Sequence, residues 1–439
     1  MVRVRWLSRA LVCCLALALT PAARAEGPLG LEEAVRLALA SNERALQAPL
    51  RVEAVEGQVE RARSAFLPTL VANGTATLRA REDRAGRVLA AGGSLTLTQP
   101  ILDLAAFPAQ AQARHELEAE RWGGVQDRRQ VAFDTARAFL VVLTSERVVE
   151  AATRRLERAR ANQQNAEARA QAQLASTNDV TRALVETAAA AREVAQAQGN
   201  VAENYQQLSF LVARPVSGPL VAPDRTTRAA ETGGLSAEDV VRSAEARRPD
   251  LRAAEERTAG LREAAKEPLY RLAPTLSAQA QIRMTVDPIP PDPAHEETAQ
   301  LLLSWTIFDA GARYGDRRAR VAQAEIQALE ERQLRRSIAT DIGLALVSLR
   351  TAREAYRISE EAVNAARRNT EETEILYQQG LARAIELIDA NARLYEAEVG
   401  RVTAKLAMEQ AYLELRFARG LGPLDDPAQG AAATRGGKP

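Results

Sequence analysis

The chain has 439 residues, of which 26% are charged and only 4% aromatic, and its formal net charge at pH 7 is +1. This near-neutral balance gives no electrostatic basis for binding nucleic acid, which depends on clustered contacts between cations and phosphates. The chain has few aromatic residues and many Ala, Leu, Arg, Glu and Gln. This composition is typical of long helices and not of a compact mixed core.

Residues 1–25 have the organisation of a secretory signal peptide. Three arginines precede an apolar run at 10–19, and small residues at 23 and 25 form a cleavage site that ends at about Ala25. The apolar run is too short to span a bilayer, although an uncleaved anchor helix is the alternative interpretation. Cys13 and Cys14 lie inside this run, so the mature chain has no thiol. Because more of the apolar run follows them, we do not expect a lipoprotein.

The sequence then repeats once. The triplet ending at Asp103 (ILD) returns as the triplet ending at Asp309 (IFD), an offset of 309 − 103 = 206. Later in each half, Asp179 matches Glu386 at an offset of 386 − 179 = 207. A repeat of this kind predicts two copies of one structural unit. The predicted organisation is a first repeat at 26–218, a linker at 219–234, a second repeat at 235–421 and a flexible tail at 422–439.

Each repeat is predicted to begin with a helix and to continue into a β-hairpin, at residues 67–102 and 273–308. Apolar and polar residues alternate along these segments, which is the signal of a strand with one apolar face. The strands are about ten residues long, the length that a tilted strand needs to cross a bilayer. An ordinary soluble hairpin is the alternative. The residues predicted to face lipid are Leu70, Leu78, Leu276 and Ile282, and those predicted to face a lumen are Thr75, Thr77, Gln279 and Gln281.

Trp305, near the end of the second hairpin, is expected at a membrane–water interface, where an amphipathic ring is favoured. Burial between helices and strands is the alternative for this side chain. A long helical zone follows each hairpin, because no proline occurs between Pro108 and Pro215 or between Pro293 and Pro423. Each zone is interrupted once and is therefore expected to fold as a helical hairpin with a tight tip. The expected tips are Gln173-Leu174 and Gly380-Leu381.

Four predicted strands per chain are too few to close a membrane-spanning barrel, for which about eight is the practical minimum. Open strand edges in lipid would leave backbone groups without partners. If the strands cross a membrane, several chains must share one barrel, and a homotrimer is the natural symmetric solution. The predicted fold class is therefore mainly α with membrane β. It consists of a duplicated helix–strand–strand–helix–helix repeat, a twelve-stranded barrel shared by three chains, and a long periplasmic α-helical barrel.

Several stretches resemble TolC-type outer-membrane efflux proteins. They are the signal peptide, SLTLTQPILD, LLLSWTIFDAG and YQQGLARAIELIDANARLYEAE, and the resemblance covers about residues 31–421. It implies a trimeric channel-tunnel in the lipid of a Gram-negative outer membrane, with its helical part in the periplasm. It also implies a periplasmic adaptor protein and an inner-membrane pump as partners. The implied function is export of small molecules such as drugs or metals, or of proteins.

The resemblance further implies a gate at the periplasmic entrance. Glu386 and Asp389 correspond to acidic residues that ring this entrance, although such a pair taken alone also fits a solvated helix face. Tyr377 corresponds to a tyrosine in the network that keeps the entrance closed. Asp179 corresponds to a residue in the partner region of that tyrosine.

Two positions depart from the pattern of this family. The arginine expected two residues after the tip glycine is replaced by Ala382, with Arg383 as the neighbouring candidate for its role. The first tip has Gln173 where a glycine is usual. The tip residues are expected to contact the adaptor, and they are Gln173, Leu174, Gly380 and Leu381.

No motif for catalysis or nucleotide binding occurs in the sequence. G-x-x-x-x-G-K-[ST], G-x-S-x-G and H-E-x-x-H are absent, and the two histidines, His115 and His295, lack the spacing of metal ligands. We therefore expect no enzyme, no cofactor and no metal site. Two other interpretations stay open. A periplasmic adaptor usually has a single long hairpin, and a structural coiled-coil protein of the envelope would explain the helices but not the duplicated strands.

Overall fold

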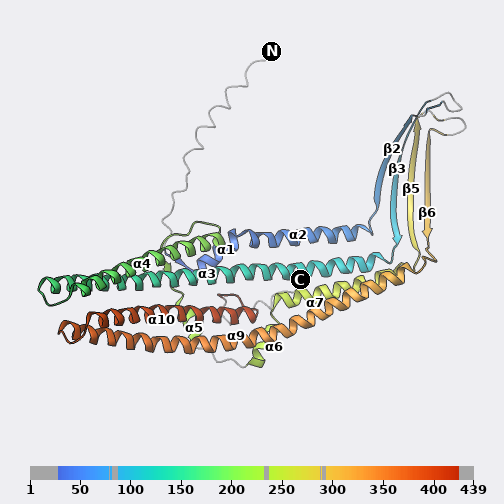
Figure 1. Ribbon diagram of the computed structural model, residues 1–439. Helices are drawn as coiled ribbons and strands as arrows, with labels where there is room; N and C mark the ends of the chain where they lie inside the picture. Colours follow the sequence, from blue (N-terminus) through green and yellow to red (C-terminus); the bar gives the residue numbers. More distant parts are fainter. Residues whose placement is uncertain are drawn as a thin grey trace, which may run out of the picture.

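In the computed structural model the chain is a long rod of helices with a small sheet at one end (Figure 1). The structure describes residues 28–78, 80–81, 88–231, 237–286, 288 and 293–424. The predicted signal peptide, residues 232–234 of the predicted linker and residues 425–439 of the predicted tail lie outside these ranges.

Two helical hairpins form most of the rod. Helix α3 (Ala106–Gln171) returns through α4 (Thr177–Val212), and α9 (Ala312–Gln378) returns through α10 (Ala384–Ala418). The starts of α3 and α9 are 312 − 106 = 206 residues apart, whereas those of α4 and α10 are 384 − 177 = 207 apart. The one-residue change of offset in the repeat is therefore absorbed inside the long helices, which have 66 and 67 residues.

Shorter helices precede each β-hairpin. In the first repeat these are α1 (Leu31–Ser41) and α2 (Glu43–Ser64). In the second they are α6 (Ala237–Glu245), α7 (Pro249–Ala264) and α8 (Glu267–Tyr270). Helix α5, with the bounds Asp224–Glu231, lies in the connection between the repeats.

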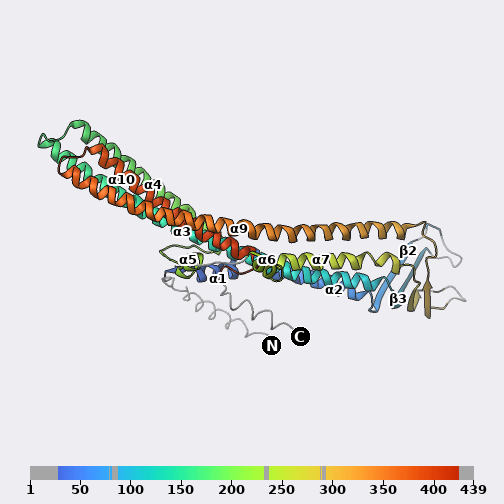
Figure 2. The same cartoon turned by 90° about the horizontal axis from the view of Figure 1, so that it is seen from below.

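Below the sheet, α2, α3, α7 and α9 lie in that order, each in contact with the next (Figure 2). Helices α3 and α7 approach closely because Gly260 has no side chain. A Cβ at this position would lie 3.1 Å from the Cβ of His115. Beside this contact, Nδ1 of His115 is 2.7 Å from a carboxylate oxygen of Glu256. The helices therefore form one layer that continues the strands.

The sheet has four antiparallel strands in the order β2-β3-β5-β6. They are β2 (Thr69–Leu78), β3 (Leu89–Leu102), β5 (Thr275–Val286) and β6 (His295–Ser304). The two hairpins join through β3 and β5, so that β2 and β6 are the outer strands of the sheet. A second, two-stranded sheet pairs β1 (Leu29–Gly30) with β4 (Leu220–Val221) in parallel.

The strand register separates most apolar from most polar residues, although Val71 and Leu302 lie on the polar face and Glu297 lies on the apolar face. Residues directly opposite one another share a face of a sheet, and successive residues alternate between faces. Leu70 lies opposite Leu97, which lies opposite Ala280. The face that they share also carries Ala72, Leu78, Leu95, Leu276, Ile282, Leu301 and Leu303. The other face carries Thr69, Asn73, Thr75, Thr77, Thr96, Thr98, Gln279, Gln281, Thr298 and Gln300.

The polar face is joined by hydrogen bonds between side chains. The amide of Gln300 donates to the side-chain carbonyl of Gln279 at 2.6 Å, and Gln281 donates to the hydroxyl of Thr96 at 3.1 Å. The apolar face is open in the isolated chain, where Leu78 is 77% and Leu301 71% exposed. The sequence-predicted split of the strands into two faces therefore matches the register of the sheet.

The largest apolar core lies near the middle of the rod, where α1, α3 and α4 meet. Phe133, Phe139 and Leu140 of α3 are fully buried there together with Leu208 of α4. Burial of each such side chain contributes about 1.5–3 kcal/mol. Phe417 of α10 packs edge-on against Phe133 with ring centroids 5.1 Å apart, so the second repeat is anchored to the core of the first.

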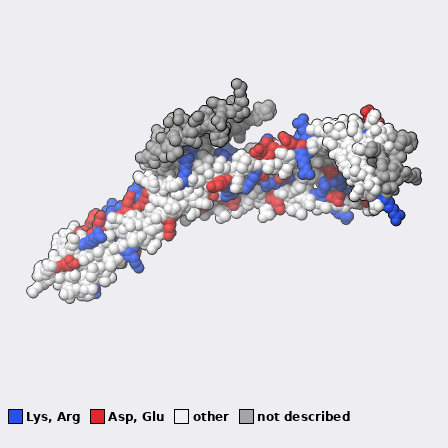
Figure 3. Space-filling view, turned by 90° about the horizontal axis from the view of Figure 1, so that it is seen from above, with Lys and Arg blue, Asp and Glu red and all other residues white. Residues whose placement is uncertain are grey.

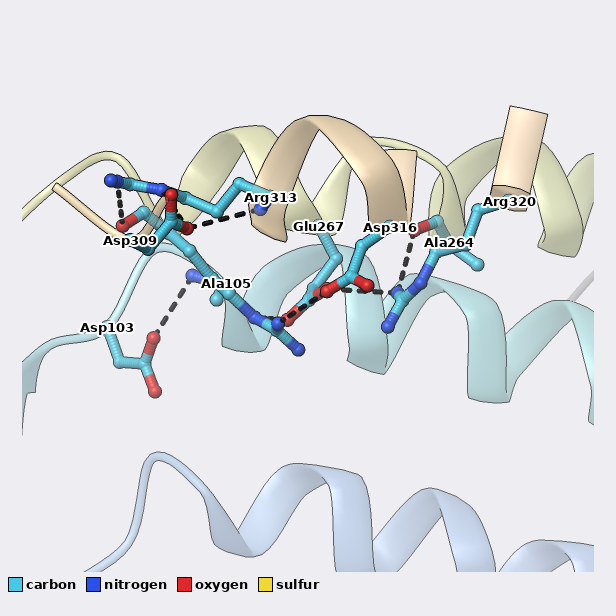
Figure 4. Close-up of polar contacts among 9 residues, drawn as sticks. Asp103, Ala105, Ala264, Glu267, Asp309, Arg313, Asp316 and Arg320 are labelled. Carbon is cyan, nitrogen blue, oxygen red and sulfur yellow. Dashed lines mark hydrogen bonds and ion pairs between the residues drawn. The ribbon is translucent and has the colours of Figure 1, made fainter. Parts of the chain in front are cut away.

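At the sheet end, aspartates position the long helices where the strands finish (Figure 4). Asp309 accepts hydrogen bonds from the backbone N–H of Gly311 (3.1 Å) and of Arg313 (3.1 Å). The Arg313 side chain is 6% exposed and donates to Asp309 at 2.7 Å. Asp103, its counterpart in the first repeat, accepts from the N–H of Ala105 at 3.0 Å. The repeated aspartate of the sequence therefore caps the turn from strand to helix.

Ion pairs extend this joint toward α7 and α8. Arg271 bonds Glu267 at 2.6 Å and Asp316 at 3.3 Å, and Arg320 reaches the second oxygen of Glu267 at 2.9 Å. Arg320 also donates to the carbonyl of Ala264 at 3.0 Å. Because these contacts cross from α8 to α9, they fix the angle between the helices and the sheet.

The predicted fold class is confirmed in its helix–strand–strand–helix–helix order, which occurs twice, and in its four strands. Closure of a shared barrel involves other chains and is taken up below. In the described part of the chain, no helix combines the length and the apolar character that crossing a membrane requires.

Candidate gate at the helical hairpin tips

The two tips of the helical hairpins lie side by side at the end of the rod opposite the sheet (Figures 1 and 2). The first tip comprises residues 172–176 and the second residues 379–383, at the same offset of 207 residues. Both turn through a left-handed residue, Gln173 with a φ of 60° and Gly380 with a φ of 77°. Gln173 thus adopts the conformation for which glycine is the usual residue.

Each tip closes with the same backbone pattern. The N–H of Leu174 donates to the carbonyl of Arg169 at 2.8 Å, and that of Leu381 to the carbonyl of Leu376 at 2.8 Å. Leu174 and Leu381 are 76% and 73% exposed. The hairpins therefore present a matched pair of apolar side chains at the end of the rod.

An acidic residue stabilises the start of each return helix. Asp179 accepts from the hydroxyl of Ser176 at 2.9 Å and from its backbone N–H at 3.3 Å, which forms a capping box. Glu386 accepts from the Nε of Arg383 at 2.9 Å and from its backbone N–H at 3.4 Å. These bonds stay within one hairpin, so the structure gives Asp179 and Arg383 a local role at their own tips.

The sequence-predicted pair of carboxylates lies on the exposed face of α10. The side chains of Glu386 and Asp389 are 45% and 58% exposed, and Asp389 bonds the Nε of Arg393 at 3.0 Å. The hydrogen bonds from Arg383 hold the pKa of Glu386 below its ordinary value. Glu386 is therefore ionised at neutral pH.

Tyr377 is buried, with 6% exposure, and its contact comes from the other hairpin. The guanidinium of Arg169, in α3, lies 4.9 Å from the centre of the Tyr377 ring. The same side chain donates to the carbonyl of Tyr377 at 3.0 Å and to that of Gln378 at 3.3 Å. These are the last carbonyls of α9, which carry the negative end of its helix dipole. Arg169 thus ties the end of one hairpin to the end of the other.

Sequence reasoning missed Arg169. It lies 208 residues before Tyr377, on the helix of the other repeat, and α3 contains many arginines. The available signal was an arginine in the last turn of a helix, close to a tip, where a cation can reach exposed carbonyls. Which carbonyls it reaches depends on how the two hairpins pack.

A second polar contact between the hairpins lies farther from the tips. Arg155 of α3 bonds Glu186 at 2.8 Å and Glu193 at 2.5 Å, both on α4, and lies 5.0 Å from the centre of the Tyr395 ring of α10. Its side chain is 11% exposed. This seam between α3 and α10 therefore joins the hairpins through a buried cation as well as through apolar packing.

The described residues contain no group of three or more His, Cys, Asp and Glu side chains that could hold a metal ion. This end of the rod therefore combines two exposed tips, an arginine contact between the hairpins and the exposed carboxylates of Glu386 and Asp389.

Comparison with protein families identifies this arrangement. Residues 240–421 match the family model described as outer membrane efflux protein. The second repeat of the chain is therefore similar to the outer membrane efflux protein family. A comparison with curated protein sequences yielded no match.

Solved structures of outer membrane efflux proteins share the fold over nearly the whole chain. The outer-membrane channel OprN is 20% identical, with a TM-score of 0.76, over 90% of this chain and 90% of its own. The MtrE outer membrane channel of Neisseria gonorrhoeae, solved in its open state, is 19% identical with a TM-score of 0.75 and the same coverage. VceC from Vibrio cholerae is 19% identical, with a TM-score of 0.73, over 90% of this chain and 97% of its own.

Proposed function

We propose that this outer membrane efflux protein is one protomer of a homotrimeric export channel of the outer membrane. The observation that carries the proposal is the sheet, whose apolar face is exposed to solvent in the isolated chain. Leu70 and Leu303 are each 63% exposed on this face. A soluble domain would cover such a face with its own helices, whereas here the helices continue the strands end to end (Figure 1). Lipid is the partner that fits an uncovered apolar face formed by strands of about ten residues.

Closure of the sheet requires neighbouring chains. Four antiparallel strands leave β2 and β6 as outer strands that run in opposite directions. Strand β6 of one chain can therefore pair with β2 of the next without breaking the antiparallel alternation. Three copies would give about twelve strands, within the range of membrane barrels. The polar face would line the lumen, and the apolar face would contact the lipid.

The helical layer would close in the same way into a tube that extends through the periplasm. Glu386 and Asp389 of three chains would then form rings of carboxylates around the periplasmic entrance. Such rings concentrate and select cations. Tyr377 and Arg169 would hold the entrance closed, whereas Asp179 and Arg383 would stiffen the tips. Conduction would be passive, and we infer that the chain has no enzymatic activity of its own.

The exposed tips would dock a periplasmic adaptor, which in turn would connect the channel to an inner-membrane pump. Leu174 and Leu381, with the preceding Gln173 and Gly380, are the residues we assign to this contact. The exported substrate, whether a drug, a metal, another toxic compound or a protein, would be chosen by that pump. Residues 1–25 would direct export and be cleaved after about Ala25, which leaves a mature chain without a lipid anchor.

Conductance measurements in planar bilayers test this proposal. The purified trimer is expected to form cation-selective channels that divalent cations block from the periplasmic side. Glu386→Gln combined with Asp389→Asn should weaken both the selectivity and the block, because the rings of charge are lost. A matched control is Glu361→Gln, which removes an exposed carboxylate from α9 away from the tips. Unchanged selectivity and block in the double variant would place the carboxylates away from the constriction.

A further inference from the structure

Two clefts flank the contact of α7 and α8 with α9 just below the sheet. The first has a volume of about 420 Å³ and is lined by Asp316 together with Thr275 and Ser304, which are paired on the polar face of the sheet. The second has a volume of about 380 Å³, and we call it the basic cleft. Its lining includes Arg262, Lys266, Leu269, Arg317, Glu325 and Arg332.

The basic cleft opens on the apolar side of the layer. A helix turns by about 100° per residue, which places residues 317, 321, 324 and 328 of α9 on average roughly 100° around the helix from residues 312, 313 and 316. The first group lines the basic cleft and the second lines the first cleft. Because the first cleft continues the polar face, the basic cleft faces the side that carries the exposed leucines of the strands.

The chemistry of the basic cleft fits an anion with an apolar tail. The lining contains four cationic side chains together with small apolar side chains. Glu325 is its one carboxylate. Lys266 bonds Glu263 at 2.6 Å, whereas Arg262 and Arg317 make no hydrogen bond or ion pair with the described residues. One guanidinium group can donate two parallel hydrogen bonds to two oxygens of a phosphate.

The surroundings place the basic cleft at the edge of the apolar surface. Trp305 continues the alternation of the β6 leucines, is 58% exposed, and donates its indole N–H to the carbonyl of Leu272 at 3.0 Å. Leu272, whose carbonyl accepts this bond, and Leu269, which lines the basic cleft, are both exposed. In Figure 3 the surface around the sheet is mostly uncharged, and charged side chains gather along the helical rod. An apolar band, then an amphipathic ring, then cations is the order found across a membrane interface.

We propose that the basic cleft binds the phosphate headgroup of an anionic glycerophospholipid in the leaflet that faces the periplasm. An acyl chain of this lipid would run over Leu269 toward the apolar face of the sheet. Arg262, Lys266 and Arg317 would hold the phosphate. This inference rests on the proposed function, because only a membrane-embedded sheet brings the cleft to headgroup level.

Fluorescence of Trp305 provides the test. Trp122→Phe in the mature trimer leaves Trp305 as the one tryptophan, since the third of the chain is Trp6 in the signal peptide. The protein is reconstituted in vesicles with increasing fractions of brominated phosphatidylglycerol or of brominated phosphatidylcholine. Brominated phosphatidylglycerol should reach half-maximal quenching at a several-fold lower mole fraction than brominated phosphatidylcholine.

Variants of the cleft residues test whether the preference for phosphatidylglycerol arises in the basic cleft. Arg317→Gln and Arg262→Gln should each raise the half-maximal fraction for phosphatidylglycerol by about fivefold, the effect of one cation near an anionic surface. The matched control is Arg318→Gln, an exposed arginine of the same turn of α9 that does not line the cleft. Retention of the preference in the two cleft variants would overturn the proposal.

The remaining outcomes separate the possible failures. Equal quenching by the two lipids would overturn the headgroup site while leaving the sheet in the membrane. Quenching by neither lipid would overturn the proposed function itself. If millimolar inorganic phosphate removes the preference as fully as the variants do, the cleft binds free anions and not a lipid. If a neighbouring protomer fills the cleft, Arg317→Gln will lower trimer stability and leave the lipid preference unchanged.

Discussion

Arg169 contacts Tyr377 and Gln378 across the interface between the hairpins, and it does so with a charged donor at the end of a helix. The family's arginine near the second tip is Ala382 here, so the cation that holds the tips together comes from the first repeat and not from the second. Hydrogen bonds made by a charged group contribute about 1.5–3 kcal/mol each. Loss of this side chain should therefore shift the gate by more than any other single change at the tips.

We expect Arg169→Gln to raise the resting conductance of the reconstituted channel, because the closed arrangement of each protomer loses about 2 kcal/mol of stabilisation. Arg160→Gln, an exposed arginine of the same helix, serves as the control. Single-channel recording gives the readout. A resting conductance equal to that of the wild type would show that the clamp does not hold the gate.

Glu409 illustrates a buried carboxylate whose protonation affects stability. It is 3% exposed, accepts from the hydroxyl of Thr227 at 2.5 Å and lies 3.8 Å from the amine of Lys405. Burial raises the pKa of Glu409 above its ordinary value despite these partners. A raised pKa means that the folded state is favoured at pH values below the ordinary carboxyl pKa and loses this contribution as the pH rises through the folded-state pKa.

Glu409→Gln should therefore stabilise the protein at pH 8 and have less effect at pH 4, because lowering the pH protonates the wild-type carboxyl and removes the cost of its buried charge. Thermal melting of the detergent-solubilised trimer at both pH values measures the difference. A variant that is destabilised equally at the two pH values would indicate that the hydrogen bond to Thr227, and not the charge, determines the result.

At the scale of elements, the strand-to-helix joints of the two repeats are built with unequal strength. Asp309 accepts three hydrogen bonds, two of them from Arg313, whereas Asp103 accepts one, from the N–H of Ala105. Burial would raise the pKa of Asp309, but the bonds from Arg313 and Gly311 outweigh it and hold the pKa below its ordinary value. This stabilisation is present above the ordinary carboxyl pKa and is lost as the pH falls through the folded-state pKa.

Asp309→Ala should consequently lower stability at neutral pH by more than Asp103→Ala, which should cost about 1 kcal/mol or less. The difference in stability between the two variants should narrow in acid, as the pH falls through the folded-state pKa of Asp309 and its carboxylate is protonated. Urea unfolding of the solubilised protein at pH 7 and at pH 3 measures both effects. Equal losses at neutral pH would mean that the additional bonds to Arg313 contribute nothing.

At the scale of the whole molecule, the outer strands β2 and β6 are where one chain would meet the next. Because both cysteines, Cys13 and Cys14, lie in the predicted signal peptide, we expect that single cysteines can be introduced without removing native ones. Asn73→Cys on β2, combined in one chain with Glu296→Cys, Thr298→Cys or Gln300→Cys on β6, scans the register between chains. All four positions lie on the polar face.

Oxidation should convert at least one of these double variants to covalently linked trimers on a denaturing gel. The pair Asn73→Cys with Thr96→Cys, on neighbouring strands of one chain, should give no linked species larger than one chain and serves as the control. Exclusive recovery of monomers from all three test pairs would contradict the shared barrel.

Much of the fold could be predicted because its signals are local or periodic. The alternation of apolar and polar residues indicates the strands β5 and β6, and the absence of proline over a hundred residues indicates the long helices. The offset of 206 residues indicates the repeat. The pairing of β3 with β5 is a contact between residues nearly two hundred positions apart, and no local pattern encodes it. Arg169 was missed for the same physical reason, since its partners are carbonyls whose positions depend on the packing of two hairpins. Glu386 was predicted through a motif, whereas its bond to Arg383 was not predicted.

The single residue by which α9 exceeds α3 has a geometric consequence for docking. The return helices compensate for it, since α10 has 35 residues and α4 has 36. One additional residue moves the second tip about 1.5 Å farther along the tube and turns its side chains by about 100°. In a trimer the six hairpins would therefore approximate sixfold symmetry without achieving it, and two kinds of groove would alternate around the rim. A set of six identical adaptor subunits would meet three sites of each kind and would have to bind in two different conformations.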